Sequence, residues 1–110
     1  MLGDAWAPLA DLEETDDAYL VQVDLPGAKK DDITVELNAG ELSVHGEIKE
    51  KERTGVLRSR TRRTGQFDYR VPLPQDTDEE HVTAELADGV LTVKVPKAQK
   101  TKPRRIEITS

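Results

Sequence analysis

Few residues of this chain have the types and spacing that enzymatic chemistry requires. Its two histidines, His45 and His81, lie in no pattern of metal ligands, and the serines lie in no nucleophile motif. The sequence has no glycine-rich phosphate loop. The absence of cysteine excludes thiol catalysis, disulfides and Cys-ligated metal sites. These observations predict a protein that is not an enzyme and that uses no cofactor and no metal.

Two charged clusters have a possible binding role. The five acids between Asp11 and Asp17 could hold Ca²⁺, but they lack the spaced ligands and central glycine of an EF-hand loop, so a solvated face is the better interpretation. The run Arg58-Ser59-Arg60-Thr61-Arg62-Arg63 could neutralise nucleic-acid phosphates. No aromatic residues interleave it and the net charge of the chain is −6. We therefore interpret the run as a charged sheet edge or a partner for acids of a second copy, and expect no nucleic-acid partner.

Along most of the chain, apolar residues recur at every second position, which is typical of β-strands. The predicted strands lie at residues 9–14, 19–25, 33–37, 42–46, 67–73, 82–86 and 91–95. Asp88-Gly89 separates the last two and is a strong hairpin signal, because both residues tolerate positive φ. No segment has the length and period of a helix. We therefore expect an all-β fold, an antiparallel immunoglobulin-like β-sandwich with an extended C-terminal tail.

Two stretches lie outside this pattern. Residues 48–64 carry seven bases, and a connection of 17 residues is long for a compact sandwich, so we expect it to have a function or to be mobile. Residues 97–105 have the composition of a solvated linker. Beyond them, Ile106 and Ile108 point the same way if the chain is extended. From the residues alone, this pair is a plug for a groove, a last strand of the same domain, or an incidental apolar pair.

The cellular location follows from what the sequence lacks. No apolar run approaches the roughly 20 residues that span a bilayer. Met1 to Pro8 is too short and too uncharged for a signal peptide. Together with the absence of cysteine, this predicts a cytoplasmic protein with no membrane partner.

Five short motifs occur along the chain in a characteristic order and spacing. They are Trp6-x-Pro8-x-x-Asp11, Val23-Asp24-Leu25-Pro26-Gly27, Gly65-x-Phe67, Ala84-x-Leu86-x-x-Gly89-Val90-Leu91 and Ile106-x-Ile108. In this arrangement they resemble the bacterial small heat shock proteins, the α-crystallin domain family, over about residues 8–108. The resemblance implies a remnant of an N-terminal arm at 1–7, a β-sandwich domain at 8–96 with a dimerisation loop at 48–64, and a flexible extension at 97–110.

The resemblance also implies a function: an ATP-independent holdase chaperone that binds partly unfolded clients, assembled from homodimers linked by their C-terminal tails. In such dimers a strand from the long loop is added to the partner's sheet edge. The residues expected at this interface are Leu9, Asp11, Leu12, Glu13, Val56, Leu57, Arg58 and Arg60. The tail anchors Ile106 and Ile108 are expected to dock in a groove between two edge strands. The expected groove residues, for tails and for clients, are Ile33, Val35, Leu37, Val82, Ala84 and Leu86.

The chain departs from the family pattern at three places. Only Met1 to Ala7 precede the domain, where the family usually has a long apolar arm. Tyr69 stands where an arginine is common. Pro72 removes a ladder donor, which is acceptable only near a strand end or at an edge. The main alternative is a CS-type β-sandwich, a co-chaperone interaction module that has no holdase assembly.

Overall fold

The computed structural model describes residues 5–74, 76–98 and 106–109. Within them the strands are β1 (Ala10–Glu14), β2 (Ala18–Asp24), β3 (Ile33–Asn38), β4 (Glu41–Ile48), β5 (Gly65–Pro72), β6 (Thr83–Ala87) and β7 (Val90–Pro96). Short 3₁₀ turns lie at η1 (Lys30–Asp32) and η2 (Glu79–His81). The predicted all-β class is confirmed, with Leu9 lying just before β1 instead of inside it. In the part of the chain described, no helix has the length and apolarity needed to cross a bilayer.

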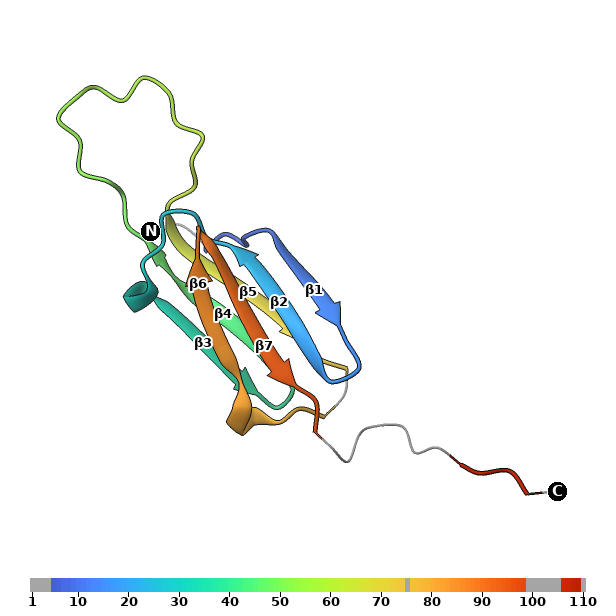
Figure 1. The fold of residues 1–110 in the computed structure, drawn as a ribbon. Coiled ribbons are helices and arrows are strands. Elements are labelled where there is room, and N and C mark those ends of the chain that lie inside the picture. Colours follow the sequence, from blue (N-terminus) through green and yellow to red (C-terminus); the bar gives the residue numbers. More distant parts are fainter. Residues whose placement is uncertain (1–4, 75, 99–105, 110) are drawn as a thin grey trace.

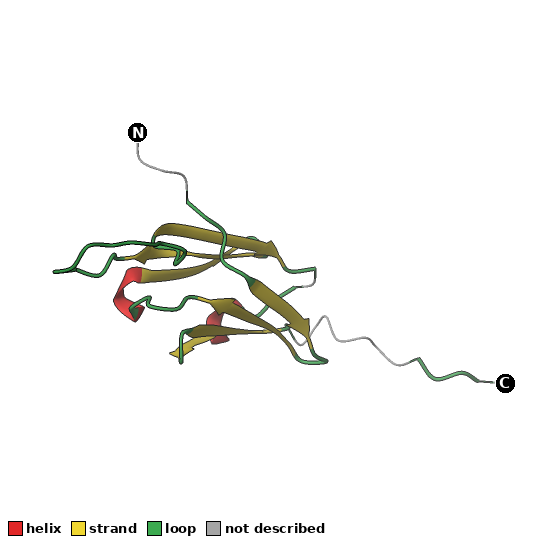
Figure 2. Ribbon diagram, turned by 90° about the horizontal axis from the view of Figure 1, so that it is seen from above, coloured by secondary structure: helices red, strands yellow, loops and turns green. Residues whose placement is uncertain are grey.

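The strands form two antiparallel sheets, one with the order β1-β2-β7-β6 and one with the order β3-β4-β5. The sheets are stacked as two layers (Figures 1 and 2). This confirms the predicted antiparallel sandwich. Pro72 is the last residue of β5, an edge strand, so its missing N–H costs no ladder bond in the middle of a sheet.

Two tight turns fix the hairpins. In the turn between β6 and β7, Asp88 has φ 53° and Gly89 has φ 77°, and in the turn between β3 and β4, Ala39 has φ 53° and Gly40 has φ 81°. Positive φ at both central residues matches the right-handed twist of the flanking strands. The carbonyl oxygen of Gly89 also accepts a hydrogen bond from the Leu25 backbone N–H (2.8 Å), so this turn is tied to the end of β2.

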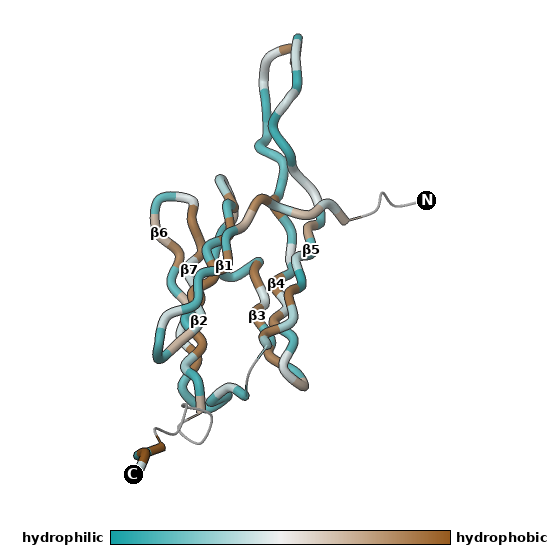
Figure 3. The backbone as a smooth tube through the Cα atoms, turned by 90° about the vertical axis from the view of Figure 1, so that its right-hand side faces the viewer, coloured by the Kyte–Doolittle hydropathy of each residue, from teal (hydrophilic) through white to brown (hydrophobic). Residues whose placement is uncertain are grey.

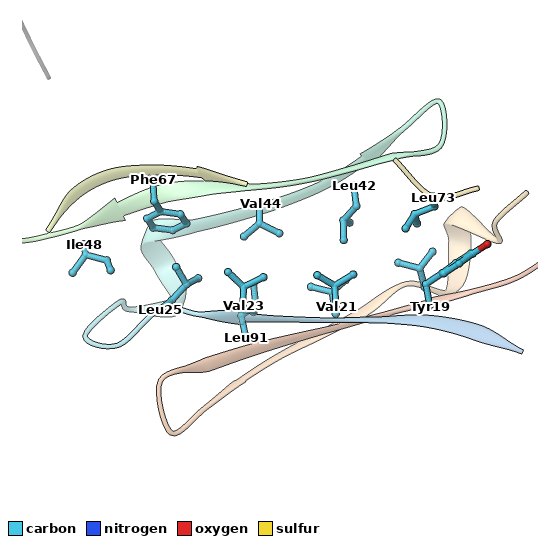
Figure 4. Close-up of a cluster of buried hydrophobic side chains, with 12 residues drawn as sticks. Tyr19, Val21, Val23, Leu25, Leu42, Val44, Ile48, Phe67, Leu73 and Leu91 are labelled. Carbon is cyan, nitrogen blue, oxygen red and sulfur yellow. The ribbon is translucent and has the colours of Figure 1, made fainter. Parts of the chain in front are cut away.

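The core lies between the two layers and follows the strand alternation (Figure 4). Its buried members are Tyr19, Val21, Val23, Leu25, Leu42, Val44, Ile48, Phe67, Leu73, Leu91, Val93 and Val95. Gly46 occupies an inward position between Ile33 and Phe67. A Cβ there would lie 2.0 Å from the Asp32 carbonyl oxygen and 3.0 Å from the Phe67 ring, so only glycine leaves room for that ring.

The chain crosses between the layers near its N-terminus. Trp6 makes two backbone hydrogen bonds, both 3.0 Å, with Gln66 and Asp68 on the outer edge of β5. Three residues later the Leu9 carbonyl accepts a hydrogen bond from Asp24 N–H on β2 (2.9 Å), and β1 begins. The segment therefore links the β5 edge of one sheet to the β1 edge of the other. On the opposite side the edge strands are β3 and β6 (Figure 1).

Candidate functional site

The predicted groove residues come together at the β3 and β6 edges. Ile33, Val35 and Leu37 lie opposite Gly46, Val44 and Leu42, so they share the inward face of their sheet, and all three are half-buried. Ala84 and Leu86 lie opposite the buried Val93 and Leu91 in the other sheet. Ala84 is exposed and Leu86 is half-buried, whereas Val82 is half-buried just before β6. Both edges thus offer inward-facing apolar side chains that the core leaves partly uncovered.

A hollow lies at the side of the sandwich where the edge strands are β3 and β6. It has a volume of about 700 Å³ and lies between η1 and β6. Its lining residues are Lys29, Lys30, Asp31, Ala84, Glu85 and Leu86. Charged side chains therefore surround an apolar strip, an arrangement suited to an apolar segment with polar flanks.

The predicted tail anchors are exposed to solvent. The Ile106 and Ile108 side chains are 82% and 92% exposed, and residues 106–109 form no strand. The alternative that they form a last strand of their own domain is therefore wrong for this structure. The predicted linker residues 99–105 and the predicted arm residues 1–4 lie outside the described residues.

The long loop extends beyond the sandwich (Figure 1), and most of it is hydrophilic (Figure 3). Every residue from Lys49 to Arg63 is exposed, and the single chain forms no strand there. The Val56 side chain is 79% exposed and that of Leu57 is 42% exposed. Arg60 forms an ion pair with Glu50 inside the loop, and Arg58 is also exposed. An apolar pair and several arginines are thus presented together, away from the core.

The expected recipient of this loop, β1, is an edge strand with one neighbour, β2. Asp11 and Glu13 lie on its outer face, and Leu12 lies opposite Val21 on the inner face but is 40% exposed. Leu9, just before the strand, is 79% exposed. The edge therefore combines free backbone groups, exposed leucines and carboxylates, which is the chemistry that an added basic strand would need.

Tyr69 on β5 has a hydroxyl pKa that is raised above its usual value. Burial raises the pKa of its hydroxyl, and the negative charge of Asp11 on β1 raises that pKa further. The tyrosine at this position, where the resembling family often has arginine, therefore lies close enough to the acidic edge strand for the Asp11 charge to act on it.

Sequence reasoning missed the role of Trp6, which it placed in a remnant arm. The ring lies 6.1 Å from the Phe67 ring, its Nε1 donates to the Thr64 carbonyl oxygen (3.0 Å), and the Arg63 guanidinium lies 5.6 Å from the ring centroid. Pro8, two residues on, is buried. The signal was present as the only tryptophan in a chain with four aromatic residues, two positions before a proline.

The histidines make local surface contacts. His45 Nε2 lies 2.9 Å from Glu36 Oε1, and His81 Nδ1 lies 2.7 Å from Asp78 Oδ2. Across the described ranges, no three His, Cys, Asp or Glu side chains gather as a metal site would require.

Comparisons with known proteins agree with this geometry. A family model, the Hsp20/alpha crystallin family, matches residues 11–109. Small heat shock protein C4 of Rickettsia felis is 31% identical over 105 residues, covering 94% of this chain and 64% of that protein. The 16.9 kDa class I heat shock protein 1 of Triticum aestivum is 45% identical over 104 residues, covering 90% of this chain and 69% of that protein.

A solved structure gives the same answer for the fold. A small heat-shock protein from Xylella fastidiosa superposes with a TM-score of 0.79 at 34% identity, covering 97% of this chain and all of that one. Small heat shock proteins are non-enzymatic chaperones, which agrees with the prediction that the chain is not an enzyme. With its residues 11–109 matched and its two-sheet architecture shared, the chain belongs to the Hsp20/alpha-crystallin family of small heat shock proteins.

Proposed function

We propose that this chain acts as an ATP-independent holdase, which binds partly unfolded proteins and prevents their aggregation, and that it assembles from dimers linked by C-terminal tails. One observation carries the proposal: the chain holds both an open apolar groove, at β3 and β6, and an exposed two-isoleucine peptide, at Ile106 and Ile108. A groove and a peptide that are complementary in chemistry suit docking between copies.

The energetics favour such docking. Burying an isoleucine side chain gains roughly 1.5–3 kcal/mol of transfer free energy, so two anchors offset the cost of ordering the tail. Alternate residues of an extended chain lie on one face, about 7 Å apart. Ile106 and Ile108 therefore have the same spacing as Val35 and Leu37 on the groove strand β3.

The dimer is supported by charge. The loop from residue 49 to residue 64 carries seven bases and two acids, whereas residues 11–17 carry five acids and no base. In the proposed dimer a strand around Val56 and Leu57 pairs with the partner's β1 and buries its exposed leucines. Arg58 and Arg60 then lie near the partner's Asp11 and Glu13. Complementary charge steers two copies together and opposes incorrect pairing.

Clients use the same groove in this proposal. The apolar segments of partly unfolded proteins compete with the tail for the β3 and β6 edges. Heating favours tail release, because a freed tail regains conformational entropy. The cytoplasmic location stays a prediction from the sequence.

The test replaces both anchors, Ile106→Ala with Ile108→Ala, and uses Thr109→Ala as a matched control in the same exposed segment. We expect native mass to fall to that of a dimer in the double variant and to stay unchanged in the control. Light scattering of a heated enzyme, with and without this protein, tests client protection separately. A monomer whose behaviour is unaffected by loss of residues 97–110 would instead support the CS-type module.

A further inference from the structure

The root of the C-terminal tail is fixed on both sides by backbone hydrogen bonds. The Lys97 N–H donates to the Asp17 carbonyl oxygen (2.7 Å) in the turn between β1 and β2. On the other side Lys97 forms an antiparallel bridge with Thr77, and the Ala98 N–H donates to the Asp76 carbonyl oxygen (3.1 Å). The strand direction of β7 therefore continues for two residues beyond Pro96.

The Lys97 side chain adds a third contact, because it reaches over β2 to the neighbouring strand β1. Its Nζ lies 2.7 Å from Glu14 Oε2 on β1 and 5.3 Å from the centroid of the Tyr19 ring, which is fully buried. Only 8% of the lysine side chain is exposed, although lysine is rarely buried unless it is paired. The hydrogen bond to Glu14 raises the pKa of the Lys97 ammonium, so the group stays charged in this position.

We propose that Lys97, held by Glu14, is the positioning residue of the C-terminal tail: it sets the direction in which the tail leaves the sandwich and so which neighbouring copy the anchors reach. The inference rests on the proposed tail docking. It differs from that proposal because it assigns a role to residues outside both the groove and the anchors.

The short length of the tail makes its starting direction matter. Seven residues separate Ala98 from Ile106, so the anchor lies at most about 30 Å from the root even when the chain is fully extended. A root fixed in one direction concentrates the anchor in a limited volume. That raises its effective concentration at a correctly placed groove and lowers the ordering cost of docking.

The principal variant is Lys97→Met, which keeps the apolar stem and removes the ammonium. Lys94→Met is its matched control, since Lys94 lies three residues earlier, on β7, and is exposed on the outer face opposite Leu20. We expect Lys97→Met to broaden the native mass distribution and to speed subunit exchange about tenfold, the effect of losing one charge-assisted hydrogen bond. Lys97→Arg should restore most of the wild-type behaviour, and Lys94→Met should change neither quantity.

A second readout does not depend on assembly. In the dimeric background of Ile106→Ala with Ile108→Ala, the amide order parameter of Ala98 should fall from a rigid value of about 0.85 to below about 0.6 when Lys97→Met is added. If Lys97→Met fails to fold, Glu14→Gln removes the same contact from its other partner. Glu47→Gln, an exposed carboxylate on the outer face of β4 opposite Gln66, is the matched control for that variant.

The outcomes separate the two proposals. An unchanged order parameter at Ala98, or a lowered one without any change in mass or exchange, overturns the positioning role while the anchor variants still test docking. If instead the anchor variants leave the native mass unchanged, tail docking fails and the positioning role fails with it. A lowered order parameter together with a broadened mass distribution supports the inference.

Discussion

The two open sides of the sandwich are built from different chemistry. On the side of β1 and β5, the Trp6 segment bridges the layers, carboxylates line β1, and the basic loop follows β4. On the side of β3 and β6, the inward residues are apolar and partly uncovered. An unpaired strand edge is a template for another chain, so each side needs a way to select its partner. In the proposed assembly the first side selects its partner by charge and the second by apolar shape, so we expect different conditions to disrupt them.

The largest effect is expected from a charge placed in the groove. Ala84→Arg alters an exposed residue on the inward face of β6, so the fold should tolerate it. A docked isoleucine would bury the new charge without a partner, which should weaken tail docking by about 100-fold or more. Native mass measures the loss of species larger than a dimer.

The control for this variant is Thr83→Arg on the outer face of the same strand, opposite Lys94. It adds the same charge without facing the groove, so the assembly should keep its wild-type mass. If Ala84→Arg and the wild type had the same native mass, the groove at β3 and β6 would not be the docking site of the tail.

Salt should weaken the contact at β1 and leave the groove intact, the reverse of the effect of Ala84→Arg. Raising ionic strength from about 0.1 M to about 1 M shortens the Debye length from roughly 10 Å to roughly 3 Å and screens exposed charges. We expect the dissociation constant of the dimer to rise about tenfold, since its loop and edge charges are exposed. Sedimentation of the dimeric variant Ile106→Ala with Ile108→Ala measures this constant.

Apolar docking provides the internal comparison for the salt experiment. Burial of isoleucine side chains does not depend on screening, so the tail-to-groove affinity should hold or rise with sodium chloride. A tail peptide carrying residues 97–110 and titrated into the dimeric variant measures it. A groove that weakened with salt as much as the dimer would show that charge controls both sides.

Stability should respond to the Trp6 contact. Trp6→Ala removes a half-buried ring from Phe67 and a hydrogen bond to the Thr64 carbonyl, so the free energy of unfolding should fall by about 2 kcal/mol. Urea unfolding measures it. Gln22→Ala, on the exposed outer face of the central strand β2, is the control and should change stability by less than about 0.5 kcal/mol.

The fold was predictable where local rules decide. Alternation marked the strands, and Asp88-Gly89 marked a hairpin whose two central residues do have positive φ. The period also identified the inward residues of β3 and β6, but it could not show that Ala84 is exposed. Exposure depends on which strands end a sheet, and that is decided by pairing across the whole chain.

The contacts that sequence reasoning missed join distant residues. Trp6 Nε1 bonds to a carbonyl 58 positions away, and Lys97 pairs with Glu14 across 83 positions. Neither leaves a periodic signal, since each is a single contact between segments that only the folded chain brings together. The roles of the loop, groove and tail came from a family resemblance and not from the pattern, so they stay predictions that the variants above test.

The smallest effect concerns Tyr69 and the acidic edge strand. Burial, and then the charge of Asp11, raise the pKa of the Tyr69 hydroxyl above its usual value of 10.0. A raised folded-state pKa means that the neutral hydroxyl is favoured in the fold. Its contribution to stability is therefore complete below pH 10 and is lost as the pH rises through the raised pKa.

Asp11→Asn removes the carboxylate charge but not the burial, so it should lower the pKa of Tyr69 only part of the way towards 10.0. NMR titration of ring-labelled tyrosine measures this, with Glu13→Gln on the same face of β1 as the control. Because a partner's basic loop would neutralise Asp11, dimer formation should shift the pKa of Tyr69 in the same direction as Asp11→Asn. If the pKa of Tyr69 responded to neither change, the Asp11 charge would not reach Tyr69. The charge that distinguishes the β1 side from the groove would then act only on exposed groups.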